Sequence, residues 1–459
     1  MAGTSLAKNG AGRRVNAQPG LTGKAASTTR LHPARTKAFA LGRGGGARCC
    51  SPKQRAHQRP MGHTGAHPSP PHNPPANAMN LFHCDHCQAQ VYFDNNTCLG
   101  CGAVLAFLPG ELNMAGFVLT AETSDGTPEG FHARLGAPEG EICGWRPCVH
   151  RHGARACNWA VAVDDPNPEC PSCRLTVIAA SAPELDQERR WYAVESAKRR
   201  LLHTLLSLGI PLRPKASPDD WTGLAFVWQV PESGQQVVTG HHNGTITLNL
   251  AEADDDQRES ARVAFNEPLR TVLGHLRHEI SHYLDMRFVD SDAALASEFT
   301  QLMGDKQRDY KAALNTYYAQ GAPTDWQKSH ISAYASAHPW EDWAETCAHY
   351  LLIVDAVETA AAWGLRLDNA PEAQDSQATG TASLSAKHLV LQYWLPVSRF
   401  LNGMARSIGL RDSYPFVIEP TVLTKLDFVQ RVLQAASTAP TDVLQTPHLP
   451  VEQPSPTYV

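Results

Sequence analysis

Apolar residues recur at helical spacing in some stretches of this chain and alternate with polar residues in others. Between 184 and 208 they repeat every three to four positions, which predicts an amphipathic helix ending before Gly209. Its other face is basic, with Arg189, Arg190, Lys198 and Arg199. The stretches 224–228 and 244–250, with Asn243-Gly244 as a turn signal, predict strands that are either core strands or an edge for an extended peptide.

Helical patterns dominate the second half of the chain. An apolar run from 268 to 288 predicts one helix, residues 293–320 are mostly helical in pattern, and Pro339 suits the first turn of another helix. Further helices are expected near 386–408 and 420–436. With 459 residues, the chain has room for two or three domains. The pattern predicts an α+β fold, mainly helical with a small β-sheet.

The charges are distributed unevenly. Residues 1–78 contain 12 Lys and Arg residues and no Asp or Glu, whereas the remainder holds 28 basic and 45 acidic residues. We expect the leader to be disordered. It would be a nucleic-acid arm, an organelle transit peptide or, as we favour, an extension upstream of a native start at Met79. The acidic remainder argues against nucleic-acid binding by the main body.

Twelve cysteines occur without a secretory apolar segment, which favours metal binding in a reducing compartment over disulfides. No run is apolar and long enough to cross a membrane, so we expect a cytoplasmic protein without a membrane partner. Two Cys-x-x-Cys knuckles around a short hairpin predict a structural zinc ribbon over residues 79–108, with Gly102 allowing a tight turn. The predicted ligands are Cys84, Cys87, Cys98 and Cys101. His83 and His86 are substitutes that the site does not need.

A second group of cysteines predicts another zinc-binding module, over residues 109–180. Its expected ligands are Cys148, Cys157, Cys170 and Cys173. Cys143 is the spare thiol of this group. Neither module has a basic cluster with interleaved aromatic residues, so a stabilising role or the docking of a protein partner is favoured over nucleic-acid binding.

The candidate catalytic chemistry lies in the apolar run, which contains His278-Glu279-Ile-Ser-His282. On a helix, two histidines four residues apart project from one face and can bind one Zn²⁺, with Glu279 beside the open position of the metal. The bland alternative is a helix with two surface histidines. His275, one turn upstream, is expected to be a neighbour and not a ligand.

A third ligand must come from elsewhere in the chain. The metzincin pattern needs Gly at 285 and His at 288, and the sequence has Asp285 and Phe288. The best source is the helix after Pro339, where Glu341 is the expected ligand and Glu345 the supporting carboxylate that orients an imidazole. Asp285 is a further supporting candidate, and the roles of the two glutamates would also fit in reverse. Lesser candidate ligands are His338 and His349.

These groups predict metal-assisted hydrolysis of a peptide or protein substrate. Zinc would polarise a water and a carbonyl, and Glu279 would take the proton of the water as general base. An oxyanion needs a donor besides the metal, and the phenol of Tyr334, seven residues before Glu341, is our candidate. The alternative for Tyr334 is a packed aromatic residue.

The span from about 79 to 435 resembles bacterial zinc-binding metallopeptidases that carry an N-terminal zinc ribbon. The segments that carry the resemblance are Phe82 to Cys87, Ala156 to Trp159, Leu273 to Tyr283, and Pro339 to Glu345. It implies a cytoplasmic zinc protein with protease activity and no particular substrate. The domains expected are a leader at 1–78, the two modules at 79–108 and 109–180, a metallopeptidase domain at 181–436 and an unfolded tail at 437–459.

A narrower resemblance covers only the active site. The Tyr334-x₆-Glu341-x₃-Glu345 spacing is similar to that of lethal-factor-type gluzincin peptidases. It implies an oxyanion donor, a ligand and a supporting glutamate in that order. The gap between His282 and Glu341 is longer than in those toxins. Two rival functions remain at this point, a non-catalytic zinc protein that docks partners through its ribbons and a nucleic-acid-binding ribbon protein.

Overall fold

In the computed structural model, the described residues are 81–120, 130–136, 143–153, 155–177, 185–230, 239–265, 269, 271–367 and 384–438. They belong to one structural unit, residues 70–459. The predicted leader, 1–78, and nearly all of the predicted tail lie outside the described residues. Among the described helices, none combines the length and apolar character needed to cross a bilayer.

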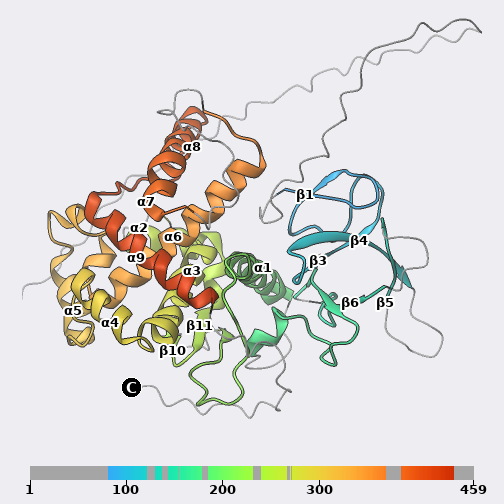
Figure 1. Ribbon diagram of the computed structural model, residues 1–459, viewed down its shortest axis with the longest axis horizontal. Coiled ribbons are helices and arrows are strands. Elements are labelled where there is room, and N and C mark those ends of the chain that lie inside the picture. Colours follow the sequence, from blue (N-terminus) through green and yellow to red (C-terminus); the bar gives the residue numbers. More distant parts are fainter. Residues whose placement is uncertain are drawn as a thin grey trace, which may run out of the picture. The chain divides into compact units, whose positions relative to one another are not determined.

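The strands of the described residues form four small sheets (Figure 1). The N-terminal part contains a two-stranded, a three-stranded and another two-stranded antiparallel sheet: β1 (Phe82–His83) with β2 (Gln90–Val91); β3 (Val104–Leu108), β4 (Asn113–Thr120) and β5 (Gly130–Arg134); β6 (Trp145–Pro147) with β7 (Ala160–Ala162). The remaining sheet has the order β10 (Gly240–His242), β11 (Thr245–Asn249), β9 (Ala225–Gln229) and β8 (Thr176–Val177).

Helices dominate from residue 185 onward, which confirms the α+β class with zinc-ribbon strands in front. The α-helices are α1 (Leu185–Ser207), α2 (Asp255–Phe265), α3 (Val272–Leu284), α4 (Ala293–Leu302), α5 (Tyr310–Gln320), α6 (Pro339–Ala362), α7 (Ala386–His388), α8 (Leu395–Ser407) and α9 (Pro420–Ser437). Short 3₁₀ turns are η1 (Cys173–Leu175), η2 (Leu250–Ala253), η4 (Trp326–Lys328) and η5 (Tyr334–Ser336), and π-helical turns are η3 (Asp285–Val289) and η7 (Leu389–Trp394).

From Val194 onward helix α1 is covered on both faces, although its pattern predicts one apolar and one basic face. Lys198 and Arg199 are 0% and 1% exposed, because the second cysteine module covers that side of the helix. The ammonium of Lys198 donates to the carbonyl of Ser172 at 3.0 Å, and the guanidinium of Arg199 donates to that of Arg155 at 3.2 Å. A periodic pattern describes one helix and contains no information about a second module that covers its polar side.

The boundary expected at 108 lies inside a hairpin, since β3 and β4 pair antiparallel from Val104–Phe117 to Leu108–Asn113. Phe107 of β3 also bridges to Trp159, next to β7. The two cysteine groups therefore share connected strands. The rings of Phe82, Phe93 and Phe107 surround the imidazole of His203 on α1, at centroid distances of 6.3, 5.3 and 5.5 Å.

The four-stranded sheet places β10 at its edge beside α3, while the strands predicted at 224–228 and 244–250 are both internal. β11 runs parallel to β9 and antiparallel to β10. The predicted Asn243-Gly244 turn joins β10 to β11, and both residues have positive φ, 48° and 77°. A Cβ on Gly244 would lie 2.2 Å from the carbonyl oxygen of Gly223, so glycine is required there.

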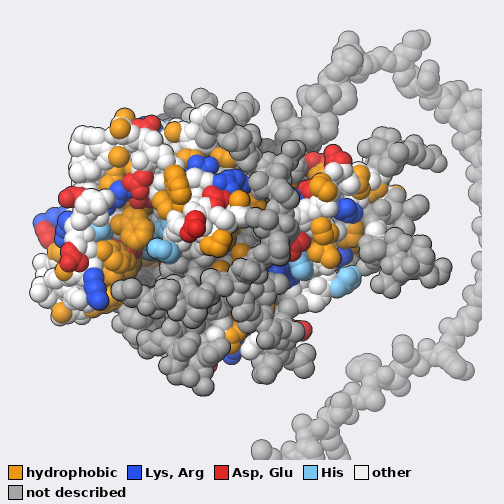
Figure 2. All heavy atoms as spheres, turned by 90° about the horizontal axis from the view of Figure 1, so that it is seen from below, with side chains coloured by type: hydrophobic (Ala, Val, Ile, Leu, Met, Phe, Trp, Pro, Cys, Tyr) orange, Lys and Arg blue, Asp and Glu red, His pale blue; other side chains and the backbone are white. Residues whose placement is uncertain are grey.

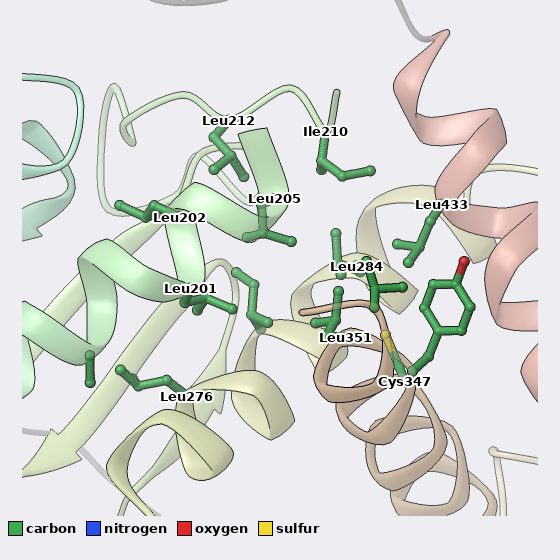
Figure 3. Close-up of a cluster of buried hydrophobic side chains, with 14 of the residues drawn as sticks. Leu201, Leu202, Leu205, Ile210, Leu212, Leu276, Leu284, Cys347, Leu351 and Leu433 are labelled. Atoms are coloured by element: carbon green, nitrogen blue, oxygen red, sulfur yellow. The ribbon is translucent and has the colours of Figure 1, made fainter. Parts of the chain in front are cut away.

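The core of the helical part lies where α1, α3, α6 and α9 meet. Figure 3 shows Leu201 and Leu205 of α1 near Leu276 of α3 and Leu351 of α6, with Leu433 on the far side. These five leucines are at most 3% exposed. Burying each leucine contributes about 2 kcal/mol, so this cluster is a large part of what fixes α3 against α6.

The two helices that carry the candidate site begin with side-chain caps. The hydroxyl of Thr271 accepts the amide of Gly274 at 2.9 Å at the start of α3. At the start of α6, Nδ1 of His338 accepts the amide of Trp340 at 3.1 Å, and Pro339 occupies the first turn as predicted. His338, a lesser candidate ligand, therefore caps a helix.

Candidate metal and hydrolase site

Three side chains from two helices converge on one point. His278 and His282 lie one turn apart on α3, and Glu341 lies in the first turn of α6. Nε2 of His278 lies 3.2 Å from Nε2 of His282 and 3.0 Å from Oε2 of Glu341. Oε2 of Glu341 lies 3.7 Å from Nε2 of His282. The structure thus brings together the three ligand atoms that the sequence predicts.

These distances fit a zinc ion. Ligand atoms ~2.1 Å from a tetrahedral zinc lie about 3.4 Å from one another. Oε2 of Glu341 is buried and has no hydrogen-bond partner among the described residues, a costly state for a carboxylate oxygen unless a cation binds it. Burial lowers the pKa of His278, but Glu341 and Glu345 outweigh burial and raise it well above its ordinary value. The site therefore attracts positive charge.

The two glutamates of α6 occupy different positions. Glu341 faces the Nε2 atoms, whereas Oε1 of Glu345 lies 2.8 Å from Nδ1 of His278. The second oxygen of Glu345 accepts the hydroxyl of Ser332 at 2.6 Å. A carboxylate on Nδ1 fixes the tautomer of the imidazole so that Nε2 is free to bind a metal. Ser332, which the sequence analysis did not single out, holds this carboxylate in place.

Glu279 lies between His278 and His282 in the sequence and is buried. It is not one of the three grouped ligands. Its Oε1 atom lies 3.2 Å from Nε2 of His275, one turn upstream. Burial raises the pKa of Glu279, but the hydrogen bond from His275 and the charges of the neighbouring histidines outweigh burial and hold it at about 2. A carboxylate ionised in this position can accept a proton.

Two tyrosines lie beside the ligands. The ring of Tyr334, in η5, is 6.0 Å from the ring of His278. Burial and the charge of Glu341 raise the pKa of Tyr334, so its phenol stays a donor. The second is Tyr310 at the start of α5, whose hydroxyl donates to Oε1 of Glu341 at 2.7 Å. The sequence gives no local signal for Tyr310, because it lies 31 residues from its partner.

Other candidate residues lie elsewhere. His349 is hydrogen-bonded to the hydroxyl of Tyr414 at 2.7 Å and is not among the grouped ligands. The supporting role predicted for Asp285 is not met, because both of its oxygens bind the ammonium of Lys306 at 2.9 Å. Nδ1 of His282 is buried and has no hydrogen-bond partner among the described residues. At Asp285 the α-helix changes to the π-helical turn η3. The prediction for Asp285 assumed a regular α-helix, so it placed this side chain wrongly.

A cavity of about 290 Å³ adjoins the His282 side of the site. The ring of Trp340 forms one wall and lies 3.9 Å from the ring of His282. The edge strand β10 contributes His241, whose ring is stacked 6.4 Å from that of His282. Asp285 and Lys306 line another side. A strand edge and a cavity therefore both lie next to the ligands.

Buried polar contacts fix α3 and α6 relative to their surroundings. Asp355 of α6 binds the guanidinium of Arg277 on α3 and accepts the hydroxyl of Thr204 on α1 at 2.7 Å. The indole N–H of Trp343 donates to the carbonyl of Ser281 at 2.7 Å. Such satisfied buried contacts specify one packing of the helices, which the convergence of distant ligands requires.

The first cysteine centre forms from two tight turns. Sγ of Cys84 lies 3.7 Å from that of Cys101, and Sγ of Cys87 lies 3.5 Å from that of Cys98. Thiolates ~2.3 Å from a tetrahedral zinc lie about 3.8 Å apart. Gly102, after the second knuckle, has a φ of 76°, as the predicted turn requires. All four thiols lie within 4.8 Å of one another.

The second cysteine centre joins four thiols that are distributed over 26 residues. These are Cys148, Cys157, Cys170 and Cys173, each at most 1% exposed. Sγ of Cys157 lies 3.6 Å from that of Cys170, and backbone amides donate to two of the sulfurs. Cys143 lies outside the group, with its thiol donating to the carbonyl of Trp145 at 3.4 Å. Both centres have the donor chemistry and spacing of zinc sites.

Two protein families match this chain. Residues 187–432 match a family described as "Putative zinc-binding metallo-peptidase", and residues 81–187 match a zinc-ribbon domain. The resemblance to zinc-binding metallopeptidases with an N-terminal zinc ribbon is confirmed, and the family together with the cysteine groups supports zinc as the metal.

Uncharacterized proteins of Mycobacterium tuberculosis H37Rv and Mycobacterium bovis are each 39% identical over 355 residues, which is 77% of this chain and 95% of each relative. No solved structure matches the chain. Because the family model covers more than half of the chain and the relatives match most of it, this protein belongs to the zinc-binding metallo-peptidase family, with a zinc-ribbon domain in front of the peptidase domain.

Proposed function

We propose that this protein hydrolyses peptide bonds at the site formed by His278, His282 and Glu341. The observation that carries the proposal is the convergence of three ligand atoms from α3 and α6 beside the buried carboxylate of Glu279. A zinc ion held there supplies a Lewis acid that polarises a water molecule and the carbonyl of the substrate. The two histidines and the glutamate make this a gluzincin-type ligand set.

In this proposal, side chains of the protein transfer the proton, stabilise the oxyanion and orient the ligands. Glu279 takes a proton from the attacking water as general base and returns it to the nitrogen of the leaving amine. The phenol of Tyr334, 6.0 Å ring to ring from His278, donates a hydrogen bond to the oxyanion that forms from the carbonyl. Glu345 orients His278, and Tyr310 orients Glu341 through Oε1, the oxygen that does not face the histidines.

The substrate is an extended peptide or protein segment. The edge of β10 lies next to α3, and the cavity beside His282 adjoins it. Backbone N–H and C=O groups of an edge strand bind an extended chain without regard to its side chains. The adjoining cavity then receives one side chain of the substrate.

Glu279→Gln tests the proposal. The amide keeps the size of the side chain but cannot accept the proton, so cleavage of a peptide library should fall by at least about 100-fold. Zinc content, measured by plasma emission spectroscopy, should stay at the wild-type value. Glu188→Gln, on the exposed face of α1, is the matched control and should cleave as the wild type does.

The result also separates the rival functions. A wild-type protein that binds zinc at this site and cleaves no peptide of the library would favour a non-catalytic protein that docks partners through its ribbons. Nucleic-acid binding is the weaker rival. On the face drawn in Figure 2, Lys and Arg side chains are interspersed with Asp and Glu and do not form one basic area. That rival would require salt-sensitive binding that is lost with residues 1–78.

We also propose that the full chain carries three zinc ions, one at the hydrolase site and one at each cysteine centre. The three ligand groups of the described residues support this number. The first cysteine centre, with its exposed knuckles, is where a protein partner would dock. We further propose a cytoplasmic location, because thiols grouped for zinc binding persist in a reducing compartment.

A further inference from the structure

A partly buried pair of side chains, His275 of α3 and Glu252 of η2, lies next to Glu279. Nδ1 of His275 lies 2.6 Å from Oε2 of Glu252, and Nε2 of the same ring lies 3.2 Å from Oε1 of Glu279. The side chains of His275, Glu252 and Glu279 are 18%, 16% and 6% exposed. One partly buried imidazole therefore bridges two carboxylates.

The hydrogen bonds determine the charge of this imidazole. An ionised carboxylate accepts hydrogen bonds and donates none, so both ring nitrogens of His275 must carry protons. His275 is then an imidazolium between two carboxylates. Burial lowers the pKa of His275, but Glu252 and Glu279 outweigh burial and raise it to about 9, in agreement with the geometry.

Glu252 is itself held in place. It lies in η2, directly after β11, where the side chain of Asn249 caps the turn by accepting the amide of Ala251 at 2.9 Å. The hydroxyl of Thr239 donates to Oε1 of Glu252 at 2.7 Å, which leaves Oε2 to His275. The bridge thus connects the end of an internal strand to the helix that carries the zinc ligands.

We propose that Glu252 and His275 are positioning residues for Glu279. A glutamate has three rotatable side-chain bonds, and a general base must be held close to one geometry to act. The imidazolium fixes one oxygen of Glu279 and thereby sets the direction of the other. This inference rests on the proposed hydrolase function for its kinetic consequence, but not for its effect on the carboxylate.

The kinetic test uses His275→Leu in the zinc-loaded full chain. Leucine fills most of the space and makes no hydrogen bond. We expect kcat on a cleaved library peptide to fall by between about 10-fold and 100-fold, with KM within about twofold of the wild-type value. Zinc content and the thermal midpoint should change little. His388→Leu, at an exposed histidine of α7, is the matched control and should behave as the wild type.

A second variant separates positioning from a plain structural tether. The double variant His275→Gln with Glu252→Gln replaces the ion pairs by a chain of amides that can still donate to Oε1 of Glu279. On a logarithmic scale, the double variant should regain at least about a third of the decrease in kcat that His275→Leu causes. His275→Gln alone should recover less, because its amide oxygen would face the carboxylate of Glu252. Equal rates for the leucine and double variants would overturn the proposal.

A binding measurement needs no activity. Acetohydroxamic acid transfers a proton to a carboxylate beside a bound zinc, so its affinity reports where Glu279 lies. By isothermal titration calorimetry, His275→Leu should weaken binding about tenfold, and Glu279→Gln at least as much. Weakened binding with an inactive wild type would reject the hydrolase function and keep the positioning role. Unchanged binding and kcat in His275→Leu, with Glu279→Gln inactive, would reject the positioning role alone.

Discussion

Each of the two cysteine centres has four cysteine ligands, but their surroundings differ. In the first, Cys87 and Cys101 are exposed, and the ligands come from a segment of 18 residues closed by its own turns. In the second, all four thiols are buried beside α1. Burial lowers the pKa of Arg199, but the nearby thiols and Glu195 outweigh burial and raise this pKa above its ordinary value. The same chemistry thus makes a centre with two exposed thiols in one place and a fully buried centre in the other.

The largest effect is expected from Cys170→Ser. Losing one thiolate of the buried centre weakens zinc binding and exposes α1, so the free energy of unfolding should fall by roughly 4 kcal/mol or more. Denaturant titration followed by tryptophan fluorescence measures this, because Trp159 is buried next to the centre. Cys143→Ser, at the spare thiol, should stay within about 0.5 kcal/mol. Equal losses in both variants would refute the assignment of the ligands.

A smaller effect is expected from Arg199→Leu. The guanidinium is 1% exposed and faces thiolates and Glu195, so its removal leaves buried negative charge uncompensated. We expect a loss of about 3 kcal/mol. Arg200→Leu is the neighbouring control. It breaks a partly exposed ion pair with Asp94 and should cost less than about 1 kcal/mol. If the control loses as much as Arg199→Leu, the difference between the centres does not come from the buried cation.

The smallest effect on stability should come from the first centre. A strong chelator should remove its zinc at least about tenfold faster than that of the second, because exposed turns open more easily than a buried core. Absorbance of a colorimetric chelator should therefore show separate fast and slow phases. Cys87→Ser should abolish the fast phase and leave α1 and the slow phase unchanged. A fast phase that persists in this variant would come from another centre.

The sequence predicted features that depend on neighbours along the chain. The Cys-x-x-Cys turns, the helix bearing His278 and His282, and the helix beginning at Pro339 all follow from spacing within one or two turns. The sequence pattern also indicated Glu341 and Glu345, because residues four apart on one helix lie on the same side of it.

Features that depend on tertiary packing could not be predicted in this way. Tyr310 reaches Glu341 from another helix, and Glu252 reaches His275 from a turn 23 residues upstream. The burial of Lys198 follows from a module that covers α1, which no helical pattern encodes. Asp285 binds Lys306 and no ligating histidine, and the α-helix changes to a π-helical turn at this residue. In each case the deciding contact joins elements that are separate in sequence.

The separation of the ligands has a consequence for the order in which a growing chain becomes competent. The ribbon thiols are complete once residue 101 has emerged during synthesis. The hydrolase site lacks Glu341 until α6 is made, and Asp342 beside it is held by Lys425 of α9. Since domains fold as they leave the ribosome, from the N-terminus first, the cysteine centres precede the hydrolase site. A nascent or truncated chain would therefore bind zinc at its cysteine centres before His278, His282 and Glu341 can come together.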